Sequence, residues 1–258
     1  MDSVTRLPIQ RVTAEARIET EDTVVRELPL TIFLNGEEVI TLLCSPSALD
    51  ALAVGFLFSE GIIKNRDEIG EVVVDAGDSM VMVSTTGNVE LDAWSLSRPV
   101  ITSAGGKRSS SNPAGFTAQS RIESGVTVSA GEVMALVAGF QRRSAVFQAT
   151  GGVHSAALCD TREILVFADD IGRHNAIDKV LGHCFLQGIA TDDRIILTSG
   201  RIPSEILLKV ARARVPIVAS VSAPTDLGVK LADGLGITAI GFVRGDRMNV
   251  YTHAERIT

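Results

Sequence analysis

Apolar and polar positions in the first third of the chain alternate in the manner of β-strands. The pair Asn35-Gly36 separates two apolar segments and readily adopts the positive φ angles that a tight hairpin needs. The pattern therefore predicts an N-terminal portion richer in strand than in helix. Its predicted strands are TIFL (31–34), VITLLC (39–44), EVVVD (71–75) and MVMVSTT (80–86).

Helical spacing of apolar residues follows the first hairpin. Leucine, alanine and phenylalanine recur on one face from Leu49 to Leu57, until Gly61 offers a stop. Ser45 is placed to cap this helix, and Pro46 suits its first turn. We predict a helix whose apolar stripe belongs to the core rather than to a cofactor site.

A run rich in glycine, serine and proline, TSAGGKRSSSNPAG, interrupts the pattern between residues 98 and 120. Such a run buries little and is typical of a loop or linker. We therefore divide the chain into a strand-rich N-terminal portion (1–120) and an α/β domain (121–258). Beyond the run, Ser129 and Glu132 form a capping box at the start of a predicted helix that extends to about residue 140.

Short apolar segments alternate with amphipathic ones from about residue 150 onward, which indicates a layered α/β domain. Parallel strands need crossover helices, so at least part of the sheet is expected to be parallel, with ligand-binding loops at the carboxyl ends of its strands. The predicted strands are VHSAALC, EILVFAD, RIILTSG, PIVASVS and ITAIGFVRG, and the predicted helices are 173–188, 204–213 and 225–235.

Composition narrows the classes of ligand. The 258-residue chain carries a net charge of −7 and only 4% aromatic residues, so it repels a nucleic-acid polymer and offers few rings on which bases could stack. A small anionic ligand is still compatible with this charge. No apolar run is long enough to span a membrane and no signal segment is evident, so we expect a soluble protein.

The three cysteines, Cys44, Cys159 and Cys184, are odd in number and widely separated. This pattern argues against a disulfide framework and a zinc cluster, and it fits a reducing cytoplasm. A thiolate is the natural carrier of sulfur where it is exposed near positive charge. These cysteines lie in apolar surroundings, so structural roles are favoured and no catalytic nucleophile is assigned.

Three predicted strands end in small-residue turns, ATGGVHS (149–155), LTSGRIPSE (197–205) and GFVRGDR (241–247). Glycines such as Gly151 and Gly200 let backbone amides approach phosphate closely, and a following helix adds its partial positive charge. An ordinary structural turn is the favoured explanation of each of them when it is taken alone, since glycine is the commonest turn residue. Three arginines beside the turns favour phosphate binding, because a guanidinium can hold two phosphate oxygens at once. These arginines are Arg201, Arg244 and Arg247.

The segment ADDIGRHNAIDK (168–179) gathers charged residues at a predicted helix start. Its carboxylates are explained by helix capping and by pairing with Arg173. The alternative gives His174, and similarly His154, the role of a polar ligand contact or proton-transfer group. Neither H-x-E nor C-x-x-C occurs around these histidines, so no metal site is predicted.

Five separated blocks of sequence resemble the formate dehydrogenase accessory protein family, FdhD. The resemblance extends from about residue 28 to Tyr251 and Thr252. The blocks are LAVGFLFSEGII (52–63), TGGVHSAAL (150–158), DIGRHNAIDKVLG (170–182), TSGRIPSEILLK (198–209) and SAPTDLGVKLA (222–232).

The resemblance implies a cytidine-deaminase-like α/β/α fold, a homodimer and a cytoplasmic role in activating formate dehydrogenase. Members of the family are sulfurtransferases that take sulfur from a cysteine desulfurase. They pass it to molybdenum held by two molybdopterin guanine dinucleotides, a guanine-nucleotide-containing pterin cofactor that they bind. The family's cofactor-binding segment corresponds here to Phe242, Val243, Arg244, Gly245, Asp246 and Arg247. We add Gly151, His154, His174, Gly200 and Arg201 to the predicted cofactor-binding set.

The chain departs from this family at the loop that delivers sulfur. The family carries C-x-x-C after a Thr-Ser pair, whereas Thr102-Ser103 is followed here by Ala104, Gly105, Gly106 and Lys107. Two hypotheses remain. Either sulfur transfer uses Cys44, Cys159 or an external sulfide, or the chain carries the cofactor without covalent chemistry. A nucleoside deaminase, which the fold alone suggests, lacks its zinc signature.

Overall fold

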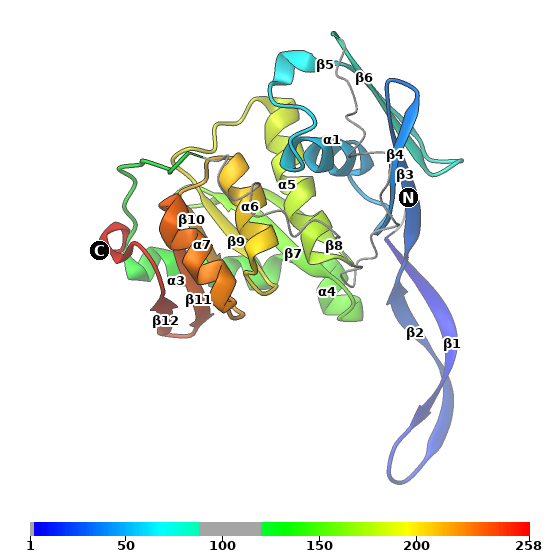
Figure 1. The fold of residues 1–258 in the computed structure, drawn as a ribbon. Coiled ribbons are helices and arrows are strands. Elements are labelled where there is room, and N and C mark those ends of the chain that lie inside the picture. The colour runs from blue at the N-terminus through cyan, green and yellow to red at the C-terminus, as the bar shows by residue number, and fades with distance from the viewer. Residues whose placement is uncertain (1–2, 88–119) are drawn as a thin grey trace.

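The computed structural model describes residues 3–87 and 120–258, and a six-stranded sheet forms the centre of its larger part (Figure 1). The strand order is β12-β11-β10-β9-β7-β8. The three strands β9, β10 and β11 run parallel, and β7, β8 and β12 join through antiparallel pairings. The strands are β7 (His154–Cys159), β8 (Ile164–Asp170), β9 (Ile195–Thr198), β10 (Ile217–Ser220), β11 (Thr238–Arg244) and β12 (Arg247–Val250).

Helices cover both faces of this sheet (Figure 1). Apolar side chains of α5 (Arg173–Gln187), α6 (Ser204–Arg212) and α7 (Asp226–Leu235) form one core with the sheet, and α3 (Ala130–Arg143) forms another on the opposite face. The predicted layered α/β/α class and the partly parallel sheet are confirmed. The predicted capping box at the start of α3 is also present, since Ser129 Oγ accepts from Glu132 N.

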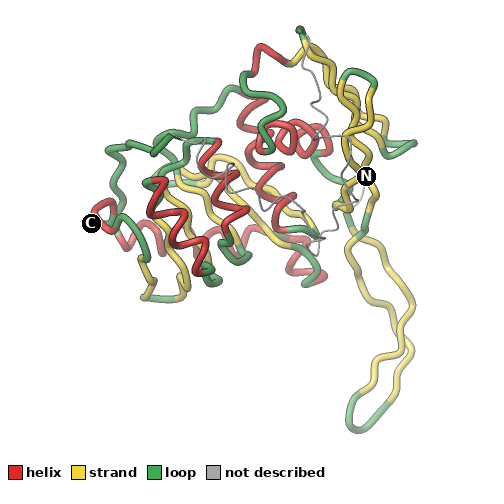
Figure 2. Tube along the Cα trace, viewed as in Figure 1, coloured by secondary structure: helices red, strands yellow, loops and turns green. Residues whose placement is uncertain are grey.

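A second, four-stranded sheet carries the N-terminal part of the chain (Figure 2). Its order is β4-β3-β6-β5, and the β3–β4 turn has the expected positive φ angles at Asn35 (51°) and Gly36 (84°). Its elements confirm the four predicted strands. They are β3 (Leu28–Leu34), β4 (Glu37–Cys44), α1 (Leu49–Ser59), a 3-10 turn (Arg66–Glu68), β5 (Ile69–Asp75) and β6 (Met80–Thr85).

The predicted cap of the first helix is wrong. The helix α1 begins at Leu49 after Ala48, which has a left-handed φ of 48°, and no side chain caps it. Ser45 is occupied elsewhere, because its backbone N–H and its hydroxyl both donate to the buried Asp170 carboxylate, at 3.0 and 3.2 Å. A partner 125 residues away thus overrides the local capping preference.

The helices α1 and α5 cross in close contact and join the two sheets. A Cβ built on Gly55 would lie 1.8 Å from Asp178 O, and one built on Gly182 would lie 1.9 Å from Ala51 O. Only glycine therefore fits at either position, because real Cβ atoms do not approach backbone so closely. Phe185 and Leu186 of α5 also pack into the core of the N-terminal part.

A long hairpin of β1 (Val4–Val12) and β2 (Arg17–Val25) projects away from the body (Figures 1 and 2). The hydrophobic pattern did not predict it. We call residues 4–25 the arm. Its base contacts the short helix α4 (Ala145–Thr150), and Val25 lies against Gly152.

Two predictions lie outside the described residues or at their edge. The altered loop Ala104–Lys107 falls within residues 88–119, which the structure does not describe, and the predicted boundary at residue 120 adjoins them. Both stay predictions. No helix among the described residues is long and apolar enough to cross a membrane.

Candidate functional site

One edge of the six-stranded sheet collects the features that favour an anion. The parallel strands β9, β10 and β11 end there, and β7 begins there because it runs antiparallel to β9. The helices α5, α6 and α7 all start at this edge, directly after β8, β9 and β10. No side chain caps the first turn of α5 or of α6. The partial positive charges of these helix starts therefore face the edge.

A cavity of about 470 Å³ opens at the same edge, where α3, α4 and β7 meet. Its predicted members are Gly151, which ends α4 with a left-handed φ of 65°, and His154. Sequence reasoning missed the remaining lining. The full lining is Phe140, Gln141, Ser144, Phe147, Gly151, Gly152, Val153, His154, Ser155, Ile171, Ser199 and Val221.

His154 stands at the start of β7 as a half-buried, neutral ring. Its Nδ1 lies 3.2 Å from Ser199 Oγ, which also accepts the Ser155 N–H at 3.0 Å. Burial lowers the pKa of His154, and the charges of Arg173 and His174 lower it further. The ring is therefore uncharged at neutral pH and offers hydrogen bonds rather than charge to a ligand.

The carboxylate of Asp169 fixes one wall of the cavity. Ser155 Oγ donates to its Oδ1 at 2.5 Å, and Ser144 Oγ donates to its Oδ2 at 2.7 Å. These bonds hold two lining hydroxyls in place and occupy the carboxylate. Asp169 therefore serves as a positioning group behind the cavity surface.

Beside His154 lies a group that we call the cationic cluster, consisting of the guanidinium groups of Arg173 and Arg201 together with the imidazole of His174. Burial lowers the pKa of Arg173, and the neighbouring charge of Arg201 lowers it further, against the opposite effect of Glu205. Among the described residues, Arg173 Nε is buried without a hydrogen-bond partner. Like charges held together, with a donor unused, indicate a place prepared for an anion.

Gly200 lets the cationic cluster form. A Cβ at this position would lie 3.0 Å from the Cβ and Cδ atoms of Arg173, so the glycine allows that side chain to cross the β9–α6 turn. His174 Nε2 stands 3.2 Å from Glu205 Oε2, although without hydrogen-bond geometry. The structure thus brings together four of the predicted residues: His154, His174, Gly200 and Arg201.

The sequence left open that the carboxylates of this segment pair with Arg173, and in the structure Asp169 and Asp170 have other partners. Asp170 is fully buried and forms its ion pair with Lys179, at 2.7 Å, while it accepts from Gly172 N and Asn175 Nδ2. Asp169 is bound by the two serines. Arg173 is consequently left over as a candidate ligand-binding cation.

Arg244 of the C-terminal segment does not line the cavity, but it contacts a residue that does. Its Nε and Nη2 both donate to Val221 O at 3.3 Å, and Val221 lines the cavity. The guanidinium lies 5.8 Å from the ring centroid of Phe242, which is 37% exposed and has a left-handed φ of 54°. An exposed aromatic side chain in a strained conformation is common at ligand sites.

The remaining residues of this segment are placed differently. Val243 is 1% exposed and belongs to the core. Gly245, with φ 58°, and Asp246 form the tight turn between β11 and β12. Arg247 is exposed and opposes Arg244 in the ladder, but it does not line the cavity. The structure therefore does not gather the six residues at one point.

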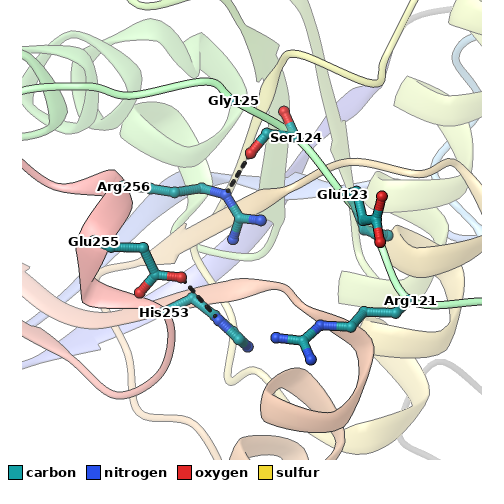
Figure 3. A pocket seen from close by; sticks show the side chains of 8 residues that line it. Arg121, Glu123, Ser124, Gly125, His253, Glu255 and Arg256 are labelled. Atoms are coloured by element: carbon teal, nitrogen blue, oxygen red, sulfur yellow. Dashed lines mark hydrogen bonds and ion pairs between the residues drawn. The ribbon is translucent and has the colours of Figure 1, made fainter.

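A more open hollow of about 560 Å³ lies at the opposite edge of the sheet, where Arg121, His253 and Arg256 converge (Figure 3). Two of these three side chains, Arg256 and His253, have structural partners. Arg256 Nη1 donates to Gly236 O at 2.9 Å, and His253 Nε2 lies 2.9 Å from Asp233 O. They bind the carbonyl end of α7, whose partial charge is negative. We therefore favour the cavity beside the cationic cluster as the ligand site.

All three cysteines are free and buried. Burial raises the pKa of Cys44, Cys159 and Cys184 to about 12 in each case. A thiol in this state is neither ionised at neutral pH nor accessible to a sulfur donor. Structural roles fit the cysteines, as the sequence predicted. Within the described residues, no three or more His, Cys, Asp or Glu side chains are arranged to hold a metal ion.

The described residues form a layered α/β protein in which Arg173, His174 and Arg201 lie near one another at one edge of the main sheet and all three cysteines are buried. The chain belongs to the FdhD/NarQ family, whose sequence profile matches residues 25–258. Among its relatives, sulfur carrier protein FdhD of Bacillus subtilis is 46% identical over 244 residues, 93% of this chain and 92% of the relative. The Listeria innocua protein of the same name is 41% identical over the full length of both chains.

A crystal structure of a formate dehydrogenase accessory protein from Desulfotalea psychrophila has the same fold. It superposes with a TM-score of 0.83 at 27% sequence identity and covers all of both chains. The family resemblance that the sequence blocks carried is thereby confirmed.

Proposed function

We propose that the protein is a formate dehydrogenase accessory protein that binds the molybdenum cofactor in its bis(molybdopterin guanine dinucleotide) form. The observation that carries the proposal is the cationic cluster with its unused donor, at a sheet edge where two uncapped helices begin. Pyrophosphate groups satisfy such a cluster, and the adjoining cavity has room for part of a ring system. Arg244 and Phe242 supply a second contact through Val221.

We further propose that the chain supports sulfuration of the cofactor without a persulfide on its own cysteines. The relatives are named sulfur carriers, and the resemblance gives a cysteine desulfurase as the donor. The sequence offers no cysteine besides the three buried ones. In this proposal the protein holds the cofactor while sulfur reaches it from the donor directly. The partners are the desulfurase and formate dehydrogenase, the compartment is the cytoplasm, and two copies of the chain associate.

The thiol proposal predicts that the folded protein stays free of added sulfur. After incubation with a cysteine desulfurase and cysteine, the intact mass is expected to be unchanged, because none of the three thiols is exposed or ionised. The same protein unfolded in urea should react with iodoacetamide at all three cysteines, which serves as the positive control. Persulfide found on Cys44 or Cys159 of the native chain would show that covalent relay operates after all.

Nucleotide binding tests the site itself. Titration calorimetry with GDP is expected to show binding, and Arg244→Ala should weaken it about five- to tenfold, because one charge-assisted contact near phosphate or base is lost. Arg162→Ala is the matched control, since Arg162 is exposed in the turn between β7 and β8, at the far end of those strands. Equal effects of the two substitutions, or no GDP binding by the native chain, would remove the support for this site.

A further inference from the structure

The arm is the part of the chain whose structure the body explains least. Every one of residues 10–19 is exposed, and the arm extends away from the body (Figures 1 and 2). An isolated two-stranded hairpin is marginally stable in water at best. A partner that covers one face of the arm would supply the missing stabilisation.

One face of the arm carries an apolar stripe. Residues directly opposite each other in the β1–β2 ladder share a face, so the pairs Leu7–Asp22, Ile9–Thr20 and Arg11–Ile18 lie on the same side. Leu7 is 47% exposed and Ile18 is 54% exposed. This face, which we call the stripe face, therefore combines apolar side chains with one charge of each sign.

The two charges of the stripe face cannot meet within one arm. Arg11 lies four residues along the strand from Leu7, the partner of Asp22, which is a separation of about 13 Å. A twofold axis at the Ile9–Thr20 pair brings the Arg11–Ile18 pair of one arm onto the Leu7–Asp22 pair of another. Each arginine then lies within reach of an opposite charge, and apolar side chains fill the space between. The face is self-complementary in the way that a twofold interface requires.

We infer that the arm joins two copies of this chain through their stripe faces, packed in antiparallel orientation. The inference deepens the proposed function, because it rests on the proposal that two copies associate and names the surface that they use. It also gives the base of the arm a role. Val25 lies against Gly152, which lines the cavity, so arms held by a second copy brace one wall of the candidate site.

Sedimentation velocity on the full chain over a range of concentrations tests this inference. Ile18→Asp is expected to raise the dimer dissociation constant by more than about a hundredfold, because symmetry repeats the loss of apolar burial. Val12→Asp is the matched control, since Val12 is 58% exposed on the opposite face of the arm and is expected to leave the dimer intact. All these positions are exposed, so each variant is expected to fold, and circular dichroism is the measurement that checks this.

Charge exchange provides the decisive comparison. Arg11→Asp and Asp22→Arg are each expected to raise the dissociation constant about tenfold, and the combined exchange should restore association. Restoration cannot come from within one arm, because the two positions are too far apart there. If the Ile18→Asp variant still forms dimers, the stripe face is not the interface, although the proposed association of two copies stands. If the native chain is monomeric, both proposals are wrong. GDP binding measured on the same samples reports the proposed ligand site separately.

Discussion

Replacing Arg173 by methionine is expected to weaken GDP binding by about one to two orders of magnitude, because a partly buried guanidinium no longer holds phosphate. The same change is expected to leave the unliganded protein as stable as before, or slightly more stable. Methionine keeps the packing of the stem across Gly200 and removes a charge that burial and Arg201 both disfavour. Calorimetry with GDP and thermal unfolding without ligand measure the two effects.

A loss of GDP affinity without a loss of stability distinguishes a ligand-binding arginine from a structural one. A structural arginine would lose stability and affinity together, whereas a ligand-binding arginine loses affinity alone. Arg201→Met should follow Arg173→Met, and Arg162→Met on the distant turn should change neither quantity. If Arg173→Met binds GDP as the native chain does, the cationic cluster is not the phosphate site.

The largest loss of stability is expected for Lys209→Met. Lys209 Nζ donates to both oxygens of Asp178, at 2.9 and 2.8 Å, and to Ser59 Oγ at 2.7 Å, in a network where both charged groups are buried. Removing the ammonium leaves an uncompensated carboxylate in the core, which should lower the free energy of unfolding by about 3 to 5 kcal/mol. Urea unfolding followed by circular dichroism gives this value directly.

The dependence on pH identifies the cause of that loss. Burial raises the pKa of Asp178, and Lys209 opposes the rise. Without Lys209 the pKa rises further, so the folded variant binds a proton that the unfolded chain releases, and its stability falls as the pH increases through that range. The defect should therefore shrink at mildly acidic pH. Lys230→Met, on the exposed side of α7, is the control and should change stability by less than about 0.5 kcal/mol. A defect that is the same at every pH would point to lost packing instead.

Local signals predicted the layered fold well. The Asn35-Gly36 turn, the Ser129–Glu132 capping box and the alternation beyond residue 150 each follow from short-range preferences that the tertiary structure leaves unopposed. The arm was not predicted, because a hydrophobic pattern reveals a strand only where one of its faces is buried. Its strands have no buried face among the residues that the structure describes, so no core imposes a clear apolar alternation on them.

Parts of the site depended on contacts that no local pattern reveals. The role of Arg173 is visible only when Asp170 is seen to pair with Lys179 and Asp169 with two serines. Proximity in sequence left open that these carboxylates pair with Arg173. Ser199 and Val221 line the cavity because β9 and β10 are neighbouring strands that end at the same edge of the sheet. The order of strands along the chain does not reveal which of them are neighbours in the sheet.

Asp170 makes the turn before α5 rigid. Its Oδ2 accepts hydrogen bonds from the backbone N–H and the hydroxyl of Ser45 in the N-terminal part. Its Oδ1 accepts from the backbone N–H of Gly172 and from Asn175 Nδ2 at the start of α5. The turn that presents Arg173 is thus clamped from two sides before any ligand arrives. A bound nucleotide should therefore leave the backbone of residues 170–175 unchanged. We expect a preformed site rather than induced fit.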